Sequence, residues 1–219
     1  MKIGTDGVLL GAVASLKNRP TSILDIGAGT GVIALMLAQR SEAETIDAVE
    51  LDNQAYEQCV ENFEASEWAD RLFCYHASFQ EFYEEMDETY DCIVSNPPFF
   101  EENVSSTSIA RDNARQNRAL PFEELIKGVG KLLAINGVFV LIVPTNQEKK
   151  VLDLADQHQL WPFEILRVKG NPNVPPKRSI VQFSHAKVSV LEEELTIEIE
   201  RHQFTREYIQ LTKDFYLKM

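Results

Sequence analysis

The sequence predicts an α/β fold with a doubly wound, mostly parallel seven-stranded sheet and an antiparallel edge. Short apolar, β-branched runs alternate with stretches of helical spacing along residues 22–156, and such alternation implies right-handed crossovers between parallel strands. After residue 156 the strands follow one another through turns, which is typical of antiparallel pairing. We find no long linker and no repeat, so we expect a single domain over residues 1–219.

Four strands and their crossovers supply the first half of the predicted sheet. Their β-branched and apolar runs are bounded by turn residues, and the segments between them carry helical spacing. The expected strands are Ser22–Ile26, Thr45–Glu50, Leu72–His76 and Tyr90–Ser95, and the expected helices cover residues 31–39, 54–64 and 79–86.

The second half begins with a helix at 122–133, a nearly continuous apolar strand at 138–143 and a helix at 148–156. Alternating residues then predict three strands joined by turns, and a stiff Pro-rich stretch at 170–176 predicts a hairpin connection. These strands cover residues 162–168, 179–184 and 195–200, and a capped closing helix covers 205–217.

Composition excludes several classes of protein. The 219 residues are 44% hydrophobic and 25% charged, as in an ordinary globular domain. No apolar run approaches the length of a membrane span. The cysteines (Cys59, Cys74 and Cys92) and the four histidines are widely spaced, so we expect no disulfide framework, no metal site, no membrane partner and a reducing, cytoplasmic location.

The charge is unevenly distributed along the chain. The net charge is −13, which by itself argues against a nucleic-acid partner because phosphate contacts supply most of such affinity. Residues 42–91, however, hold sixteen acids against one arginine, whereas residues 109–187 hold twelve Lys and Arg against seven acids. The mildly basic half therefore leaves a nucleic-acid partner open, and we expect the acidic half to lie at the opposite edge.

A glycine-rich turn, residues 27–31 with the sequence Gly-Ala-Gly-Thr-Gly, follows the first strand and opens the first helix. Such glycines permit a tight turn and let a ligand approach the backbone at a helix N-terminus. A dinucleotide fingerprint needs glycine where this chain has Val32, so the loop does not favour a pyrophosphate. Glu50 ends the second strand nineteen residues after Gly31, where a carboxylate accepts hydrogen bonds from ribose hydroxyls.

Residues 23–31 and 49–52 together resemble the S-adenosylmethionine-dependent class I methyltransferases. The resemblance implies a Rossmann-like fold and S-adenosylmethionine as the cofactor. It also implies three contacts: Asp25 with Gly27, Gly29 and Gly31 at the methionine end, Glu50 at the ribose, and Ser78 with Phe79 beside the adenine. Read locally, Ser78 is equally a helix cap and Phe79 a core aromatic.

The turn Asn96-Pro97-Pro98-Phe99 leaves the fourth strand at its carboxyl end, where doubly wound sheets bind ligands. Each proline restricts its own φ and holds the preceding residue extended. The Asn96 side-chain oxygen and the Pro97 carbonyl then form two rigid acceptors, which suit an exocyclic amino group with two hydrogens to donate. They also stabilise the positive charge that develops on its nitrogen, and Phe99 suits stacking on a base.

The Asn-Pro-Pro-aromatic turn resembles amino-methyltransferases that act on adenine N6, guanine N2 or glutamine nitrogen. Further segments resemble the bacterial tRNA1(Val) adenine-N6 methyltransferase family, and the resemblance covers essentially the whole chain. These segments are residues 2–12 and 176–179, Arg111, residues 114–115, and residues 211–217. The resemblance implies methylation of the purine immediately 3′ of the anticodon, a base in a single-stranded loop.

In that family the Thr5 and Asp6 positions help close the cofactor pocket, and Asn96 also borders the cofactor; local sequence alone makes Thr5 and Asp6 a helix N-cap pair. Members often carry Tyr at the Phe99 position and usually a longer segment before Lys2. The resemblance therefore implies either that a substrate-gripping arm is missing here or that this member dispenses with it.

Basic residues indicate where RNA would bind. Arg111, Arg115 and Arg118 follow the Asn-Pro-Pro turn, and the remaining candidates are Lys149, Lys150, Arg167, Lys169, Lys177 and Arg178. We expect the first two arginines, Lys177 and Arg178 to contact substrate RNA and the others to share their rim. The alternative is ordinary solvated surface.

Three other functions stay open. A guanine-N2 rRNA methyltransferase shares the turn but not the terminal motifs, and a glutamine-N5 protein methyltransferase typically has a helical domain before the glycine loop. A non-catalytic cofactor- or RNA-binding protein is the alternative of another class. The intact Asn96-Pro97-Pro98-Phe99 turn argues against that last alternative.

Overall fold

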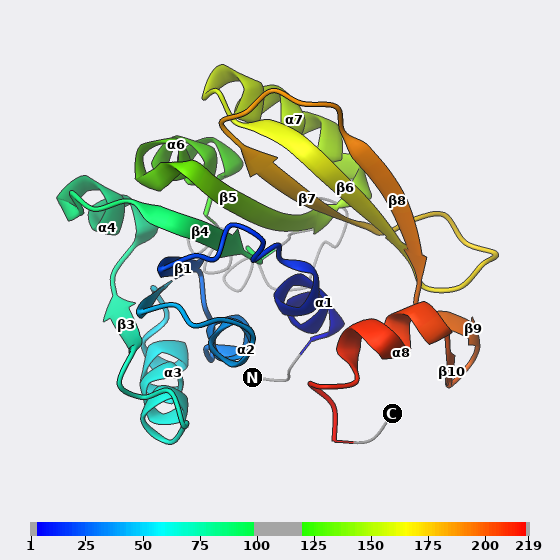
Figure 1. The fold of residues 1–219 in the computed structure, drawn as a ribbon, viewed down its shortest axis with the longest axis horizontal. Coiled ribbons are helices and arrows are strands. Elements are labelled where there is room, and N and C mark those ends of the chain that lie inside the picture. The colour runs from blue at the N-terminus through cyan, green and yellow to red at the C-terminus, as the bar shows by residue number, and fades with distance from the viewer. Residues whose placement is uncertain (1–3, 99–119, 218–219) are drawn as a thin grey trace, which may run out of the picture.

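The computed structural model describes residues 4–98 and 120–217 and contains an eight-stranded sheet in the order β3-β2-β1-β4-β5-β7-β6-β8 (Figure 1). A second sheet pairs the short strands β9 (Glu198–Glu200) and β10 (Gln203–Phe204). The strands of the main sheet are β1 (Ser22–Ile26), β2 (Thr45–Glu50), β3 (Leu72–His76), β4 (Tyr90–Ser95), β5 (Leu133–Pro144), β6 (Trp161–Lys169), β7 (Arg178–Ser184) and β8 (Leu191–Thr196).

Helices cover both faces of this sheet, as the doubly wound prediction requires. Their buried apolar side chains form two large clusters, one for each face. One face carries α1 (Thr5–Val13), α2 (Val32–Arg40), α3 (Asn53–Glu64) and α8 (Arg206–Thr212), and the other carries α4 (Phe79–Glu85), α6 (Phe122–Leu132) and α7 (Glu148–Gln157). A 3-10 turn, η1 (Thr145–Gln147), links β5 to α7. The predicted α/β fold with crossover helices is confirmed.

The mostly parallel character of the sheet is also confirmed, but the predicted antiparallel edge is wrong in position. Of the eight strands, β7 runs against its neighbours β5 and β6 and lies inside the sheet, whereas the edge strand β8 runs parallel to β6. The strand expected at 195–200 is replaced by β8 and β9. Two cross-strand pairs, Arg167–Glu192 and Lys169–Glu194, join β8 to β6. The main sheet therefore has eight strands, one more than the predicted seven and as many as the strand ranges expected from the sequence.

The parallel register brings three strand ends to one edge. Ile26 of β1 is the partner of Val49 in β2 and of Ser95 in β4. Gly27, Glu50 and Asn96, the residues that end or follow these strands, therefore lie at the same edge of the sheet. Because β7 runs the other way, it begins at this edge, with Arg178 opposite Pro144 of β5.

Other expectations concern the class of protein. Within residues 4–98 and 120–217 no helix is long and apolar enough to cross a membrane, and no three metal-binding side chains come together. The three cysteines are free. The acid-rich stretch 42–91 builds β2, α3, β3 and α4 at the β3 edge, away from β5, β6 and β7.

Candidate active site

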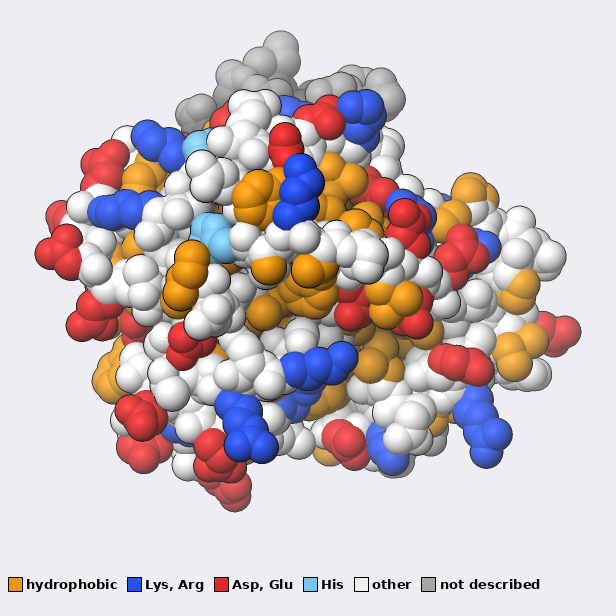
Figure 2. All heavy atoms as spheres, turned by 45° about the horizontal axis from the view of Figure 1, so that its top comes forward, with side chains coloured by type: hydrophobic (Ala, Val, Ile, Leu, Met, Phe, Trp, Pro, Cys, Tyr) orange, Lys and Arg blue, Asp and Glu red, His pale blue; other side chains and the backbone are white. Residues whose placement is uncertain are grey.

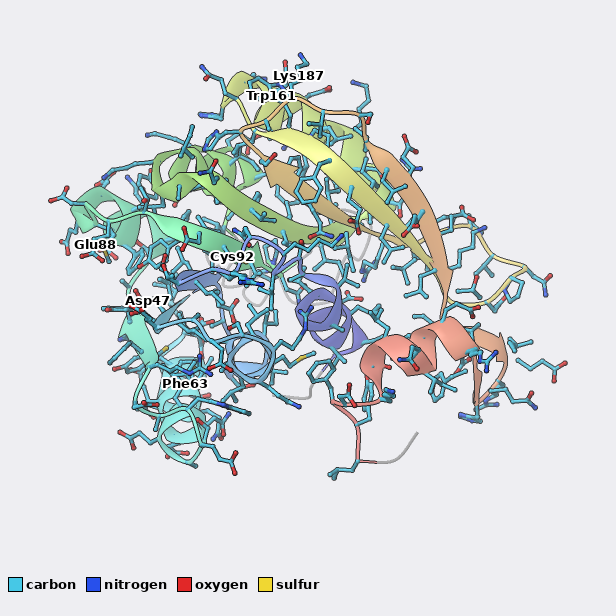
Figure 3. All side chains as sticks on the ribbon, in the orientation of Figure 1. Asp47, Phe63, Glu88, Cys92, Trp161 and Lys187 are labelled. Atoms are coloured by element: carbon cyan, nitrogen blue, oxygen red, sulfur yellow. The ribbon has the colours of Figure 1, made fainter. Side chains whose placement is uncertain are left out.

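The loop after β1 has the backbone conformation that its glycines permit. Gly27, Gly29 and Gly31 have φ values of 71°, 59° and 79°, in the left-handed region that favours glycine. A Cβ on Gly31 would lie 2.5 Å from Phe63 Cε1 and 2.8 Å from Cys59 Sγ, and Figure 3 marks Phe63 on α3. A Cβ on Gly27 would meet nothing within 4 Å. Gly31 is thus required for packing, whereas Gly27 faces open space at the start of the loop.

Glu50 holds this loop in place from the end of β2. Its Oε2 accepts the Gly29 N–H at 2.8 Å, and its Oε1 accepts the Asp52 N–H at 2.7 Å. The side chain is partly exposed, and each carboxylate oxygen can accept a further hydrogen bond. The carboxylate therefore shapes the loop and keeps acceptor capacity for the two hydroxyls of a ribose.

Asp25 lies beneath the loop and has an unused acceptor. The residue is fully buried; its Oδ2 accepts the Ala34 N–H at 3.1 Å, while its Oδ1 has no hydrogen-bond partner among the described residues. The pKa of Asp25 is raised to about 7, chiefly because the group is buried; the Ala34 N–H lowers this pKa and the Glu50 carboxylate raises it. An orphaned carboxylate oxygen next to a glycine loop fits the ammonium group of S-adenosylmethionine.

The Asn-Pro-Pro turn begins beside the glycine loop. Ser95, the last residue of β4, donates its hydroxyl to the Ile26 carbonyl at 2.9 Å. The segments that follow β4 and β1 therefore leave the sheet side by side. Asn96 is half-buried and Pro97 is buried. An ideal Cβ on Gly7 of α1 would lie 3.8 Å from Asn96 Nδ2. Asn96 therefore lies beside the first turn of α1, while Phe99 lies outside the described residues.

Thr5 and Asp6 are the first two residues of α1. The N-cap is Gly4, which provides no side-chain hydrogen bond, so the alternative prediction of a Thr5–Asp6 cap is wrong. Oδ2 of Asp6 lies 2.7 Å from Nε of Arg178 at the start of β7. The structure therefore joins a residue predicted for the cofactor to a residue predicted for RNA.

Ser78 and Phe79 follow β3 with the local roles that the sequence also allowed. Ser78 caps α4 in a capping box with Glu81: its hydroxyl accepts the Glu81 N–H, and its own N–H donates to the Glu81 carboxylate at 3.0 Å. The Ser78 hydroxyl also donates to the Glu81 carboxylate at 2.7 Å, and this bond, together with that from the Ser78 N–H, lowers the pKa of Glu81. Phe79 is buried against Tyr83 and Gly128. Their contact with adenine stays a prediction.

Most of the expected basic rim is paired with carboxylates. Lys149 pairs with Asp153, Lys150 with Glu123, Arg167 with Glu148 and Glu192, and Lys169 with Glu194, at N–O distances of 2.6 to 3.0 Å. Figure 2 shows basic and acidic side chains interspersed on one face. Lys177 is exposed and forms no ion pair with a described residue, whereas Arg111, Arg115 and Arg118 lie outside the described residues.

Sequence reasoning missed two residues at this edge. Leu51, directly after Glu50, is 49% exposed and offers an apolar surface beside the carboxylate. Asn62 of α3 donates its Nδ2 to the Thr30 carbonyl at 2.8 Å and ties the loop to that helix. The position of Leu51, directly after the acid that ends a strand, could have identified it from the sequence. No local sequence pattern identifies Asn62.

Comparison with known proteins shows the family of this chain. The model of the methyltransferase small domain family matches residues 6–157. Proteins of Christiangramia forsetii and Flavobacterium johnsoniae, both named tRNA1(Val) (adenine(37)-N6)-methyltransferase, are 58% and 56% identical to this chain over its whole length and are covered to 92% and 94% of their own.

Solved structures show the same fold. A protein of Agrobacterium tumefaciens described as a predicted O-methyltransferase superposes with a TM-score of 0.74 at 20% identity, over 95% of this chain and 96% of that one. A ribosomal protein L11 methylase of Lactobacillus delbrueckii subsp. bulgaricus has a TM-score of 0.58 at 15% identity, over 83% and 77%. The chain therefore belongs to the methyltransferase small domain family, whose methyl donor is S-adenosylmethionine, and within it to the tRNA1(Val) (adenine(37)-N6)-methyltransferases.

Proposed function

We propose that this chain, working as a single domain in the cytoplasm, methylates the N6 amino group of the adenine next to the anticodon of tRNA(Val). The observation that carries the proposal is the meeting of three elements at one edge of the sheet. These elements are the glycine loop held by Glu50, the unpaired oxygen of Asp25, and Asn96 beside the first turn of α1. The relatives named for this reaction span the whole chain.

In this proposal Asn96 and Pro97 bind the amino group of the substrate base. An aromatic amine is a poor nucleophile because its lone pair is delocalised into the ring. When the Asn96 side-chain oxygen and the Pro97 carbonyl accept its two hydrogens, they favour a lone pair directed out of the ring plane. The same oxygens stabilise the positive charge that forms on nitrogen. S-adenosylmethionine, when bound, supplies an electrophilic methyl group on its sulfonium.

The rigidity of the turn matters for this role. Pro97 and Pro98 fix the backbone, and Pro97 is buried, so the acceptors are in place before the substrate arrives. Pre-organised acceptors need no reorientation during the reaction. The product ammonium is acidic enough to lose its proton to water, so the site requires no dedicated base.

The assignment of cofactor contacts follows the geometry. Glu50 would accept the ribose hydroxyls, Asp25 and the loop glycines would hold the methionine end, and Leu51 presents an apolar surface for the base. Phe99 would stack on the target adenine, and Arg111, Arg115 and Lys177 would contact RNA.

The test is nucleoside mass spectrometry after incubation of the chain with S-adenosylmethionine and tRNA from a host that lacks this modification. The proposal predicts N6-methyladenosine at the position 3′ of the anticodon of tRNA(Val). N2-methylguanosine, or methylation of a protein glutamine in a parallel reaction, would replace the proposal by one of the other amino-methyltransferase functions. No transfer to any of these substrates, with S-adenosylmethionine still bound, would favour a non-catalytic role.

A further inference from the structure

Arg178 and Asp6 lie 172 residues apart in the sequence and form an ion pair in the structure. Nε of Arg178 is 2.7 Å from Oδ2 of Asp6, and the two side chains are 32% and 30% exposed. We propose that Arg178 is a positioning residue that holds the first turn of α1 over the S-adenosylmethionine site. The inference rests on the proposed function of that site and assigns Arg178 a role other than phosphate binding.

Arg178 is mounted on a rigid part of the sheet. It begins β7, where it is the register partner of Pro144 in β5 and of Val168 in β6. The neighbouring Lys177 N–H donates to the Val168 carbonyl at 2.9 Å, and the Thr145 N–H donates to the Lys177 carbonyl at 3.2 Å. Because strands flank it on both sides, the backbone of Arg178 provides a fixed point.

The first turn of α1 is anchored by the buried Val8 and by the Asp6–Arg178 pair, but its start is weakly hydrogen-bonded among the described residues. Gly4 gives no side-chain cap, and the first helical hydrogen bond, from Val8 N–H to the Gly4 carbonyl, is 3.3 Å long. The other end of the helix is held firmly, because Arg40 donates to the Gly11 and Ala14 carbonyls at 2.6 and 3.0 Å. An uncapped helix start frays readily. The ion pair between the Asp6 carboxylate and Arg178 of β7 therefore stabilises the first turn of α1.

This first turn borders the reaction site. Gly7 follows Asp6, and its ideal Cβ would lie 3.8 Å from Asn96 Nδ2. A shift of the turn would therefore change the surroundings of the Asn96 side chain. Through its ion pair with Asp6, Arg178 therefore affects cofactor binding, even though it lies next to Lys177, a candidate for RNA binding.

Cofactor affinity measured without RNA tests this assignment. Calorimetric titration with S-adenosylmethionine should show that Arg178→Ala and Asp6→Asn each weaken binding about fivefold, in keeping with a partly exposed ion pair. The double variant should bind no more weakly than either single variant, since both remove the same contact. Arg178→Lys should restore much of the affinity. Lys149→Ala, which breaks the exposed ion pair with Asp153 on α7, is the matched control and should bind normally.

Hydrogen exchange gives a readout that needs no cofactor. The amides of Val8 and Leu9 should exchange faster in Arg178→Ala and in Asp6→Asn than in the wild type or in Lys149→Ala. Asp6→Asn keeps the size of the side chain, so it still tests the pair if Arg178→Ala fails to fold.

Two results would overturn the inference. One is unchanged cofactor affinity in Arg178→Ala with weaker, less salt-dependent tRNA binding, which would make Arg178 a phosphate ligand. The other is additive losses in the double variant. Failure of the proposed function is seen separately, because it would appear as absence of N6-methyladenosine with the wild-type chain, while the exchange of the α1 amides would still report on the pair.

Discussion

The carboxylate of Glu50 accepts the N–H of Gly29 at 2.8 Å, so the acid at the end of β2 is bonded directly to the glycine loop that follows β1. Glu50→Ala removes this acceptor and that of the Asp52 N–H, along with the predicted ribose contact. We expect S-adenosylmethionine to bind at least about 30-fold more weakly, because hydrogen bonds to a charged group contribute roughly 1.5–3 kcal/mol each. Calorimetry measures the affinity.

Glu57→Gln is the control for this experiment. Glu57 lies on α3 in the same acidic segment and accepts only an exposed hydrogen bond from Asn53 among the described contacts. Its substitution should leave cofactor affinity unchanged. Equal affinity in Glu50→Ala and the wild type would remove Glu50 from the cofactor site.

Gly31→Ala and Gly27→Ala separate packing from ligand access. Both glycines have left-handed φ values, so each alanine carries a backbone penalty of about 1–2 kcal/mol. At Gly31 the methyl group also meets Phe63 at 2.5 Å, which adds about 1–3 kcal/mol of overpacking. Urea denaturation should therefore show a larger loss of unfolding free energy for Gly31→Ala.

Gly27→Ala should instead reduce the free energy of cofactor binding more than the free energy of unfolding. Its methyl group points into open space at the start of the loop, where the cofactor is expected. Comparing the losses of unfolding free energy in the two variants tests whether Gly31 is required for packing against Phe63. A Gly27→Ala variant less stable than Gly31→Ala would contradict the packing role of Phe63.

Asp25 gives stability a defined pH dependence. Burial raises its pKa to about 7 in the folded chain, so between about pH 4 and pH 7 the folded state binds more protons than the unfolded state. The contribution of Asp25 to stability is thus largest at low pH and falls as pH rises through this window. Asp25→Asn removes the titration, and its unfolding free energy relative to wild type should rise by about 1.4 kcal/mol per pH unit there.

Urea denaturation at several pH values between about 5 and 8 measures this difference. Parallel curves for Asp25→Asn and the wild type would show that the buried carboxyl does not titrate in this range.

Asn96→Ala should reduce kcat for methyl transfer by about 10²–10³-fold, the usual loss when one pre-organised electrostatic contact is removed. Asn96→Asp keeps an acceptor oxygen and should retain more activity. Single-turnover assays with labelled S-adenosylmethionine measure the rate, and Asn136→Ala, at an exposed position, is the control. Full activity in Asn96→Ala would refute the catalytic assignment.

Lys177→Ala should weaken tRNA binding and reduce the salt dependence of log K by about one unit, as expected for a single phosphate contact. Lys149→Ala, which removes a cation already paired with Asp153 at 2.6 Å, should have little effect. Filter binding across a salt series measures both quantities. An unchanged slope for Lys177→Ala would place Lys177 outside the RNA interface.

Local patterns in the sequence were sufficient for the elements that bear the site. The strands at 22–26, 45–50, 72–76 and 90–95 match their predictions residue for residue, because each is a short apolar run bounded by turn residues. The glycine loop, Glu50 and the Asn-Pro-Pro turn lie at the carboxyl ends of these strands for the same reason.

Contacts between distant segments could not be predicted in this way. The ion pair of Asp6 with Arg178, and the pairs of Arg167 and Lys169 with β8, join residues that no local period connects. The predicted closing helix at 205–217 is shorter, Arg206–Thr212, because Thr205 caps its start and the chain turns after Lys213. A count of charges likewise does not show which cations of the expected basic rim have carboxylate partners.

The strand β7, which runs opposite to its neighbours in the main sheet, has a consequence for truncation of this chain. The segment matched by the family model stops at residue 157, before β6 and β7. A polypeptide ending there would keep every glycine of the loop and the whole Asn-Pro-Pro turn, yet it would lose Arg178, the ion-pair partner of Asp6 at the start of its first helix. In this protein the last quarter of the chain thus supplies a contact to the first helix, although the site beside that helix is built by the first half.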